Sequence, residues 1–256
     1  MRALRTALLA ALMPALCAQA ADVRALLAAP RQRIESADYR VTGRLVWINE
    51  SGARVNFPIA IEAHWFPGVL RVRVDLGQPP QARSDLREHI LLEMRPDGQN
   101  TIRIAGPGDA KSIALPFAKW SDTPFGPGFS YEDFLEQQYF WPAQTAAGEA
   151  KFGARDCDMV VSKPGPADRT NYAEVKTWLD HSIGFPVYVE KTLKGTGVIK
   201  EFTYYDLRHD EGVWSASQVE EKTRGQGGST LLIVEHGSAH ANLSLKDFSP
   251  EQLARF

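Results

Sequence analysis

Apolar and polar residues alternate with a period of two along five consecutive segments in the first half of the chain. These segments span residues 41–47, 57–65, 70–76, 90–94 and 102–104. Each has one apolar face and one largely polar face, which is typical of antiparallel strands that cover a single interior. The links at 49–52, 67–68 and 96–100 are rich in Gly, Pro, Asn and Asp, as hairpin turns require.

Strand signals resume in the second half of the chain. They span residues 157–161, 172–180, 186–193, 198–207, 213–221 and 230–234. Glycine-containing turns separate several of them, and the glycine-rich run at 225–228 lies between two strand signals. Because a meander of this length must manage its edges, we expect the strands to curl or close around one interior.

Helical patterning appears at the two ends of this region and once between the two groups of strands. Residues 21–35 are a modest helix candidate that Pro30 interrupts. Residues 249–253 begin with Ser249 as a potential N-cap and Pro250 at the first helical position, which predicts a short terminal helix.

The central helix is predicted over residues 130–140. Ser130 and Asp133 are spaced as a reciprocal capping pair, and Pro142 ends the pattern. One side of the predicted helix carries Tyr131, Phe134, Leu135 and Tyr139. Since no linker divides the strands, we predict a single domain over residues 21–256, a mainly β (α+β) fold with one curved antiparallel sheet and helices against its inner face.

The first twenty residues follow a different pattern. Arg2 and Arg5 precede an apolar run that ends at Leu16, and Ala18-Gln19-Ala20 forms a small-x-small site. This order is that of a secretory signal peptide, and the run is too short to span a bilayer. We expect cleavage after Ala20. Lipidation of Cys17 is disfavoured, because Leu16 stands where a lipidated cysteine is normally preceded by a small residue.

Composition narrows the class of protein. The chain has 256 residues, of which 44% are hydrophobic and 23% charged, so it is neither disordered nor fibrous. With 29 Lys and Arg against 31 Asp and Glu, the charge offers no basis for binding nucleic acid. Cleavage would leave Cys157 without a disulfide partner in the chain. Its neighbours Asp156 and Asp158 disfavour a thiolate, so we expect it to pack in the core.

Motifs of catalytic chemistry are missing from the sequence. It has no serine-nucleophile elbow, zinc-protease helix, paired redox thiols or phosphate-binding loop. His236 and His240 have the spacing of two metal ligands on a helix, but Gly237 lies between them and a strand precedes them, which favours a solvated loop. We therefore expect no enzyme activity, no cofactor and no metal site.

An ordered set of short motifs runs through the C-terminal half. It comprises Phe129-Ser130-Tyr131-Glu132-Asp133-Phe134, Tyr172 with Trp178-Leu179-Asp180, Phe185-Pro186-Val187-Tyr188, Gly197, Lys200, Gly212-Val213-Trp214, Lys222, Gly228-Ser229-Thr230 and Phe248-Ser249 with Leu253. In order and spacing, this set resembles the bacterial outer-membrane lipoprotein-sorting family, the LolA/LolB-like proteins. The first half of the chain matches only in the rhythm of its strands.

The resemblance implies an incomplete β-barrel whose concave side holds acyl chains beneath lidding helices. It implies a periplasmic carrier of a lipid or lipoprotein, active without catalysis in transport to, or maintenance of, the outer membrane. An inner-membrane transporter or an outer-membrane acceptor would be its partner. The alternative is a periplasmic sensor or adaptor on the same fold that assists a membrane partner such as a lipid exporter. No arginine matches the lid-holding arginine of the sorting proteins, so the release mechanism is left open.

The apolar strand faces are the predicted binding surface. We hypothesise that an acyl-binding trough is lined by Leu45, Trp47, Ile59, Ile61, Trp65, Leu70, Val72, Val74, Ile90, Leu92 and Met94. The helix face with Tyr131, Phe134, Leu135 and Tyr139 would plug this trough. The same alternation also fits an interior that is filled by the protein's own side chains, and periodicity does not decide between the two.

Overall fold

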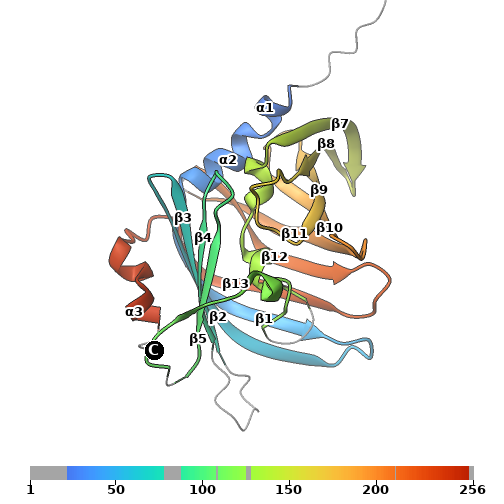
Figure 1. Ribbon diagram of the computed structural model, residues 1–256. Helices are drawn as coiled ribbons and strands as arrows, with labels where there is room; N and C mark the ends of the chain where they lie inside the picture. Colours follow the sequence, from blue (N-terminus) through green and yellow to red (C-terminus); the bar gives the residue numbers. More distant parts are fainter. Residues whose placement is uncertain (1–21, 78–87, 108, 125–127, 211, 254–256) are drawn as a thin grey trace, which may run out of the picture.

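The computed structural model describes residues 22–77, 88–107, 109–124, 128–210 and 212–253 (Figure 1). The predicted signal peptide, its cleavage site and Cys17 lie outside the described residues. The strands are β1 (Asp38–Ile48), β2 (Arg54–Phe66), β3 (Val69–Leu76), β4 (Glu88–Met94), β5 (Thr101–Ala105), β6 (Ile113–Ala114), β7 (Ala143–Phe152), β8 (Arg155–Lys163), β9 (Tyr172–Asp180), β10 (Pro186–Leu193), β11 (Ile199–Asp210), β12 (Val213–Thr223) and β13 (Ser229–Ser238). The helices are α1 (Val23–Leu26), α2 (Ala28–Glu35), α3 (Pro250–Leu253) and the 3₁₀ helices η1 (Phe117–Lys119), η2 (Tyr131–Phe134), η3 (Gln137–Phe140) and η4 (Leu245–Phe248).

All these strands form one sheet, in the order β6-β5-β4-β3-β2-β1-β13-β12-β11-β10-β9-β8-β7. The sheet is two antiparallel meanders, and the pairing of β1 with β13 joins them. Among the described residues the edge strands β6 and β7 do not pair, so the sheet curves without closing (Figure 1). This architecture confirms the predicted fold class of an incomplete barrel.

A bulge lies at the seam between the two meanders. The register of β1 against β13 shifts between Thr42 and Gly43. A Cβ atom on Gly43 would lie 1.9 Å from the carbonyl oxygen of Ile233, so only glycine permits this approach of the two backbones.

The structure contains every strand predicted from the alternation, and two that were not predicted. Strand β6 has two residues, too few to show a period. Strand β7 is an edge strand in which no residue is fully buried, and most of its residues are small or polar. An edge strand that does not have to bury one face carries no alternation for sequence analysis to detect.

The prediction of a single helix over residues 130–140 is wrong. The capping box of Ser130 and Asp133 forms, but the helix it starts is η2, which ends before Leu135, a buried residue with extended backbone. A second 3₁₀ helix, η3, then follows. Leu135 has extended backbone between η2 and η3, and its side chain is buried with Tyr131 and Tyr139 in the main core, so tertiary packing overrides the local helical pattern. The helix predicted over residues 21–35 is present as α1 and α2, and the predicted terminal helix is α3.

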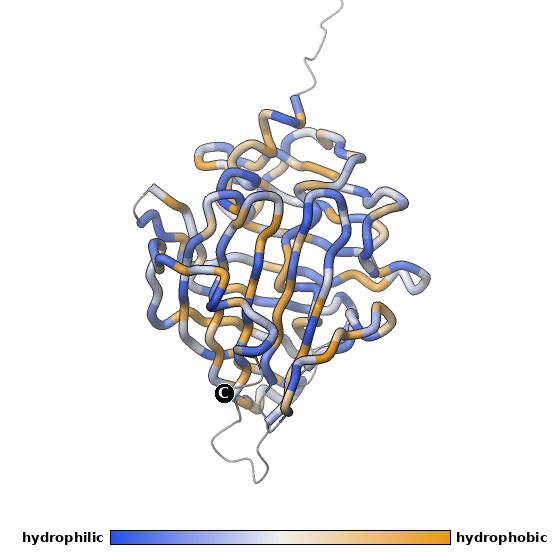
Figure 2. Tube along the Cα trace, turned by 60° about the vertical axis from the view of Figure 1, so that its left-hand side comes forward, coloured by the Kyte–Doolittle hydropathy of each residue, from blue (hydrophilic) through white to orange (hydrophobic). Residues whose placement is uncertain are grey.

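The main hydrophobic core lies between the concave face of the sheet and the segment that connects its two meanders. Figure 2 shows the alternation of hydrophobic and hydrophilic residues along the strands that places apolar side chains there. On the opposite face, Phe248 and Leu253 of the C-terminal helices pack with Leu91 of β4 in a smaller core. Among the described residues, no helix has the length and apolar character needed to cross a membrane.

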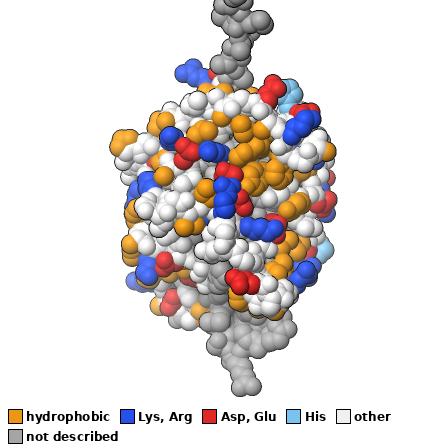
Figure 3. All heavy atoms as spheres, turned by 90° about the vertical axis from the view of Figure 1, so that its right-hand side faces the viewer, with side chains coloured by type: hydrophobic (Ala, Val, Ile, Leu, Met, Phe, Trp, Pro, Cys, Tyr) orange, Lys and Arg blue, Asp and Glu red, His pale blue; other side chains and the backbone are white. Residues whose placement is uncertain are grey.

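The outer surface is mixed in character. In the view from the right-hand side of Figure 1, hydrophobic side chains gather mainly in the upper half, among charged groups of both signs (Figure 3). Half-buried rings pack on the outer side of β7, β9 and β10, where Tyr188 lies 4.8 Å from Phe152 and 4.9 Å from Trp178 between ring centroids.

Candidate functional site

A short connecting segment fills the concave face of the sheet. We call residues 128–141 the plug; they contain η2 and η3 and cross the inner side of the sheet in Figure 1. Tyr131, Leu135, Tyr139 and Trp141 of the plug are buried in the main core together with the inward residues of the strands. The plug therefore occupies the position that the sequence predicted for a lid.

Side chains alone hold the plug against the sheet. Among the described residues, no hydrogen bond joins the plug backbone to the backbone of a strand, and its backbone–backbone hydrogen bonds run within the plug or to Trp120 and Asp122. Side-chain contacts at its ends include the Tyr131 hydroxyl, which donates to Glu88 of β4 at 2.6 Å, and the Arg33 guanidinium of α2, which donates to Glu136 at 2.5 Å. The plug is thus held by apolar packing and by side-chain hydrogen bonds, without strand pairing.

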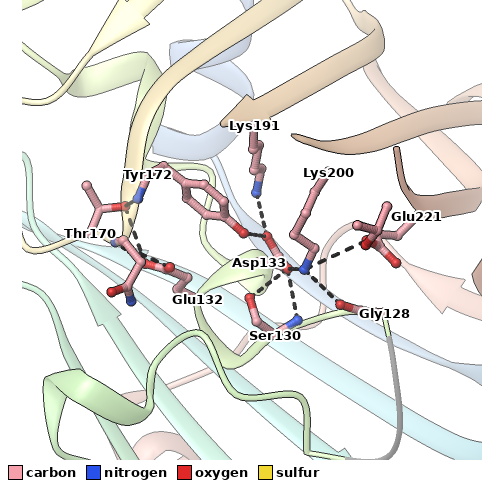
Figure 4. Close-up of polar contacts among 11 residues, drawn as sticks. Gly128, Ser130, Glu132, Asp133, Thr170, Tyr172, Lys191, Lys200 and Glu221 are labelled. Atoms are coloured by element: carbon pink, nitrogen blue, oxygen red, sulfur yellow. Dashed lines mark hydrogen bonds and ion pairs between the residues drawn. The ribbon is translucent and has the colours of Figure 1, made fainter. Parts of the chain in front are cut away.

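The central contact is a buried carboxylate (Figure 4). The Tyr172 hydroxyl of β9 donates to Oδ1 of Asp133 at 2.6 Å, and the Lys191 ammonium of β10 donates to the same oxygen at 3.1 Å. Lys200 of β11 donates to Oδ2. Ser130 gives its backbone N–H at 2.8 Å and its hydroxyl at 2.7 Å to Oδ2, which completes the capping box. Asp133 therefore links the local structure of the plug to three adjacent strands.

The two lysines occupy inward positions of neighbouring strands. Lys191 and Lys200 are register partners of β10 and β11, with side chains only 5% and 7% exposed. Lys200 also donates to the carbonyl oxygen of Gly128 at 2.7 Å and lies 3.9 Å from Glu221 of β12. The Phe202 ring lies below both ammonium groups, at 4.5 Å from Lys191 and 5.7 Å from Lys200. Two like charges on one buried face require a nearby anion.

Electrostatics distinguishes Asp133 from the other buried carboxyls. Burial alone would raise the pKa of Asp133, but the charges of Lys200 and Lys191 and the hydrogen bonds from Lys200 and Tyr172 hold that pKa well below its usual range. Burial raises the pKa of Glu221, and Lys200 offsets this only in part. Asp133 is thus the firmly ionised anion between the lysines.

The neighbouring acid, Glu132, has a separate set of partners. Its carboxylate accepts a hydrogen bond from the Asn171 backbone N–H at 3.1 Å and one from the Thr170 hydroxyl at 3.3 Å. Burial raises the pKa of Glu132, although the backbone hydrogen bond from Asn171 opposes this shift. Adjacent acidic residues of the plug therefore attach it to different places: Asp133 to three strands, and Glu132 to the loop that precedes β9.

The structure brings the predicted trough and plug residues together. Nine of the trough residues are buried in the main core: Leu45, Ile59, Ile61, Leu70, Val72, Val74, Ile90, Leu92 and Met94. Trp47 and Trp65 are half-buried and pack against this core, and so does Phe134 of the plug. The apolar faces thus meet the plug in one packed interior, and contact of these residues with a lipid stays a prediction.

Two hollows lie outside this packed interior. One of about 30 Å³, enough for about one water molecule, lies next to the plug at Gly128, Trp47 and Glu221. Another of about 210 Å³ is on the outer face of β1, β2 and β13, where Arg44 and Arg54 flank an apolar floor that includes Leu231. Of the predicted trough residues, only Trp47 borders either hollow.

The other candidates from the sequence lie apart from the plug. Cys157 is buried, as predicted, and burial raises the pKa of its thiol. Asp158 contacts His181 at 2.9 Å. His236 lies within β13 rather than in the predicted loop, because the strand continues to Ser238 in its pairing with β1. Within the described ranges, no three His, Cys, Asp or Glu side chains are grouped as metal ligands.

Sequence reasoning missed the role of the lysine pair. In the alternation of β10, Lys191 comes two residues after Val189 and four after Val187, so all three point inward. This alternation was the sequence signal that could have placed the lysine in the interior. When one lysine occurs among apolar residues on the same face of a strand, it is usually assigned to the end of the strand, where its ammonium group can reach solvent. Only the position of Asp133 shows that Lys191 and Lys200 point inward to a common partner.

Comparison with solved structures identifies the class of fold. The chain is similar to an outer membrane lipoprotein-sorting protein domain from Vibrio parahaemolyticus, with TM-score 0.78, 17% identity, and coverage of 91% of this chain and 100% of that chain. A DUF1329-family protein from Desulfovibrio piger matches with TM-score 0.76, 14% identity and coverage of 90% and 98%. A LolA-superfamily protein from Nitrosomonas europaea matches with TM-score 0.64, 12% identity and coverage of 90% and 98%.

These similarities show that the chain has the fold of the LolA-like lipoprotein-sorting proteins, as its motifs indicated. A family model described as "Uncharacterized protein"-like matches residues 97–255, and the chain belongs to that family. No curated protein matches the sequence.

Proposed function

We propose that this protein is a periplasmic carrier that binds the acyl chains of a lipid or lipoprotein on the concave face of its sheet. The observation that carries the proposal is the plug, which buries Tyr131, Leu135 and Tyr139 on that face and has no backbone–backbone hydrogen bond to a strand among the described residues. The LolA-like fold supports the same reading, since one structural neighbour is described as a lipoprotein-sorting protein domain.

The energetics favour an exchange between plug and lipid. The side chains of Tyr131, Leu135 and Tyr139 cover apolar strand residues that would otherwise meet water. An acyl chain that replaces them covers the same surface and gains about 0.8 kcal/mol for each buried CH₂ group. Apolar burial is then largely conserved, so the side-chain contacts of the plug set the balance between the two arrangements. Such binding and release needs no catalytic step.

Native mass spectrometry tests the proposal most directly. The full-length chain is expressed with export intact and purified without detergent from a lysate that contains membranes. We expect adducts with the masses of acyl lipids. A protein that carries no adduct and also fails to bind added laurate or dodecanol in solution would overturn the proposal.

A pair of matched variants tests whether acyl chains bind at the predicted trough. Trp47→Glu puts a charge at the half-buried rim of the predicted trough, whereas Leu245→Glu puts one on η4, where the side chain is 58% exposed. We expect Trp47→Glu to weaken acyl binding roughly tenfold or more, because a carboxylate is costly in an apolar site. Leu245→Glu is expected to bind as the parent does. Equal affinities in the two variants would place the acyl chain elsewhere.

A further inference from the structure

We infer that Lys191, Lys200 and Tyr172 form a binding site for the anionic head group of an acyl lipid, and that Asp133 of the plug occupies this site as an internal substitute for the ligand. This inference rests on the proposed function and adds the class of lipid that is bound. The head group would be a carboxylate or a phosphate.

The donors of the site belong to the sheet, whereas the anion belongs to the plug. Tyr172, Lys191 and Lys200 extend from β9, β10 and β11, which are adjacent in the sheet. All three donate to the two oxygens of Asp133, as Figure 4 shows. The geometry is that of a preformed anion site in which one carboxylate takes charge-assisted hydrogen bonds from two ammonium groups.

The charges of the sheet require an anion at this position. Lys191 and Lys200 face each other as register partners and are nearly buried. Like charges directly opposite each other destabilise a sheet, and Glu221 can compensate only one of them, from 3.9 Å. When Asp133 leaves, the sheet keeps one uncompensated buried positive charge, which an incoming anion would neutralise.

The surroundings suit an amphiphile better than a small free anion. The Phe202 ring lies beside both ammonium groups, and the Phe129 ring packs on it with centroids 5.6 Å apart. Phe202 belongs to the same main core as the predicted trough residues. A head group held by the lysines would therefore place its acyl chain directly on the apolar concave face.

The test compares ligands that share one chain and differ in the head group. Isothermal titration at pH 7 uses laurate, dodecyl phosphate, uncharged dodecanol and inorganic phosphate. For the parent protein we expect tighter binding of laurate and dodecyl phosphate than of dodecanol. Asp133→Asn removes the internal competitor and also a contact that holds the plug, so it is expected to bind the two anionic lipids about tenfold tighter and dodecanol tighter by a smaller factor.

A neutral variant keeps the test decisive if Asp133→Asn does not fold. In Asp133→Asn/Lys191→Met/Lys200→Met both lysines and Asp133 lose their charge while Glu221 is kept, and we expect the preference for anionic over uncharged ligands to disappear while dodecanol still binds. The matched control is Lys163→Met/Lys176→Met, which removes two lysines whose side chains are 58% and 47% exposed. This control is expected to keep the preference.

The outcomes separate the two proposals. Equal binding of laurate and dodecanol by the parent, or a preference that survives in the neutral triple variant, would overturn the head-group site and leave acyl binding intact. Binding of inorganic phosphate as tightly as dodecyl phosphate would assign the site to free anions and overturn the lipid assignment. If none of the three acyl compounds binds, the carrier function itself fails, and the head-group site fails with it.

Discussion

Lys191 and Lys200 are register partners on the inner face of β10 and β11, and their ammonium groups meet at the carboxylate of Asp133. This relationship is the main polar contact between the plug and the sheet. It also sets the energetic cost of removing the plug, because two nearly buried cations lose a common anion in that event.

Removal of the Asp133 carboxylate should strongly destabilise the fold. We expect Asp133→Ala to lower the free energy of unfolding by about 3–5 kcal/mol, since it leaves buried charges without their partner. Urea unfolding followed by tryptophan fluorescence measures this change. The control is Asp156→Ala, which breaks an exposed pair with Lys151 and should cost at most about 1 kcal/mol. Similar losses in the two variants would contradict the assigned role of Asp133.

The stability that Asp133 contributes should disappear in acid. Its pKa in the folded protein lies below the ordinary value of 3.8, so its contribution is complete above that value and is lost as the pH falls through the folded pKa. The stability difference between the parent and Asp133→Asn is therefore expected to be constant from pH 7 to about pH 5 and to narrow at lower pH. A difference that stays unchanged down to pH 3 would show that folding does not lower the pKa of the Asp133 carboxyl.

Glu221 is expected to make stability depend on pH in the opposite direction to Asp133, and the same pH series measures this. Burial raises its pKa above the ordinary value of 4.5, so the parent loses stability as the pH rises through the folded pKa of this carboxyl. Glu221→Gln lacks this titration, and we expect its stability relative to the parent to rise with pH. Parallel pH curves for Glu221→Gln and Asp133→Asn would contradict one of the two assignments, because the expected pH dependences have opposite signs.

Gly128 should be essential for the seat of the plug. Its φ is +125°, and a Cβ atom there would lie 2.2 Å from the hydroxyl oxygen of Thr230. We expect Gly128→Ala to cost about 1–3 kcal/mol from backbone strain, with a further loss from the clash. Gly148→Ala is the control, because Gly148 has φ +88° but a Cβ atom there would meet no other atom within 4 Å among the described residues. The prediction fails if Gly148→Ala costs as much as Gly128→Ala.

Export should remove the predicted signal peptide. The intact mass of the protein recovered from the periplasm of an expressing bacterium is expected to correspond to a chain that starts at Ala21. Cys17→Ser should leave this mass unchanged, since cleavage after Ala20 removes residue 17. A lipid-modified chain that begins at Cys17 would show that the lipoprotein alternative is correct.

The period-two alternation by itself determined most of the strands and their inner faces. Val72 and Val74 are fully buried as predicted, because each residue of a strand projects to the side opposite its neighbours. The local spacing of Ser130 and Asp133 likewise predicted the capping box, which depends only on residues three apart. Strand β7 escaped prediction because an exposed edge strand imposes no such pattern.

Tertiary structure decided what lies against those faces. The pairing of β1 with β13 joins distant parts of the chain, and no local pattern specifies such a partner. The alternation also could not show that the plug fills the interior. Nor could it show that the Asp133 carboxylate, besides forming the capping box, accepts hydrogen bonds from Lys191 and Lys200. The role of a charged residue that points into the interior depends on the partner that folding places next to it, since burial of the charge without that partner is unfavourable.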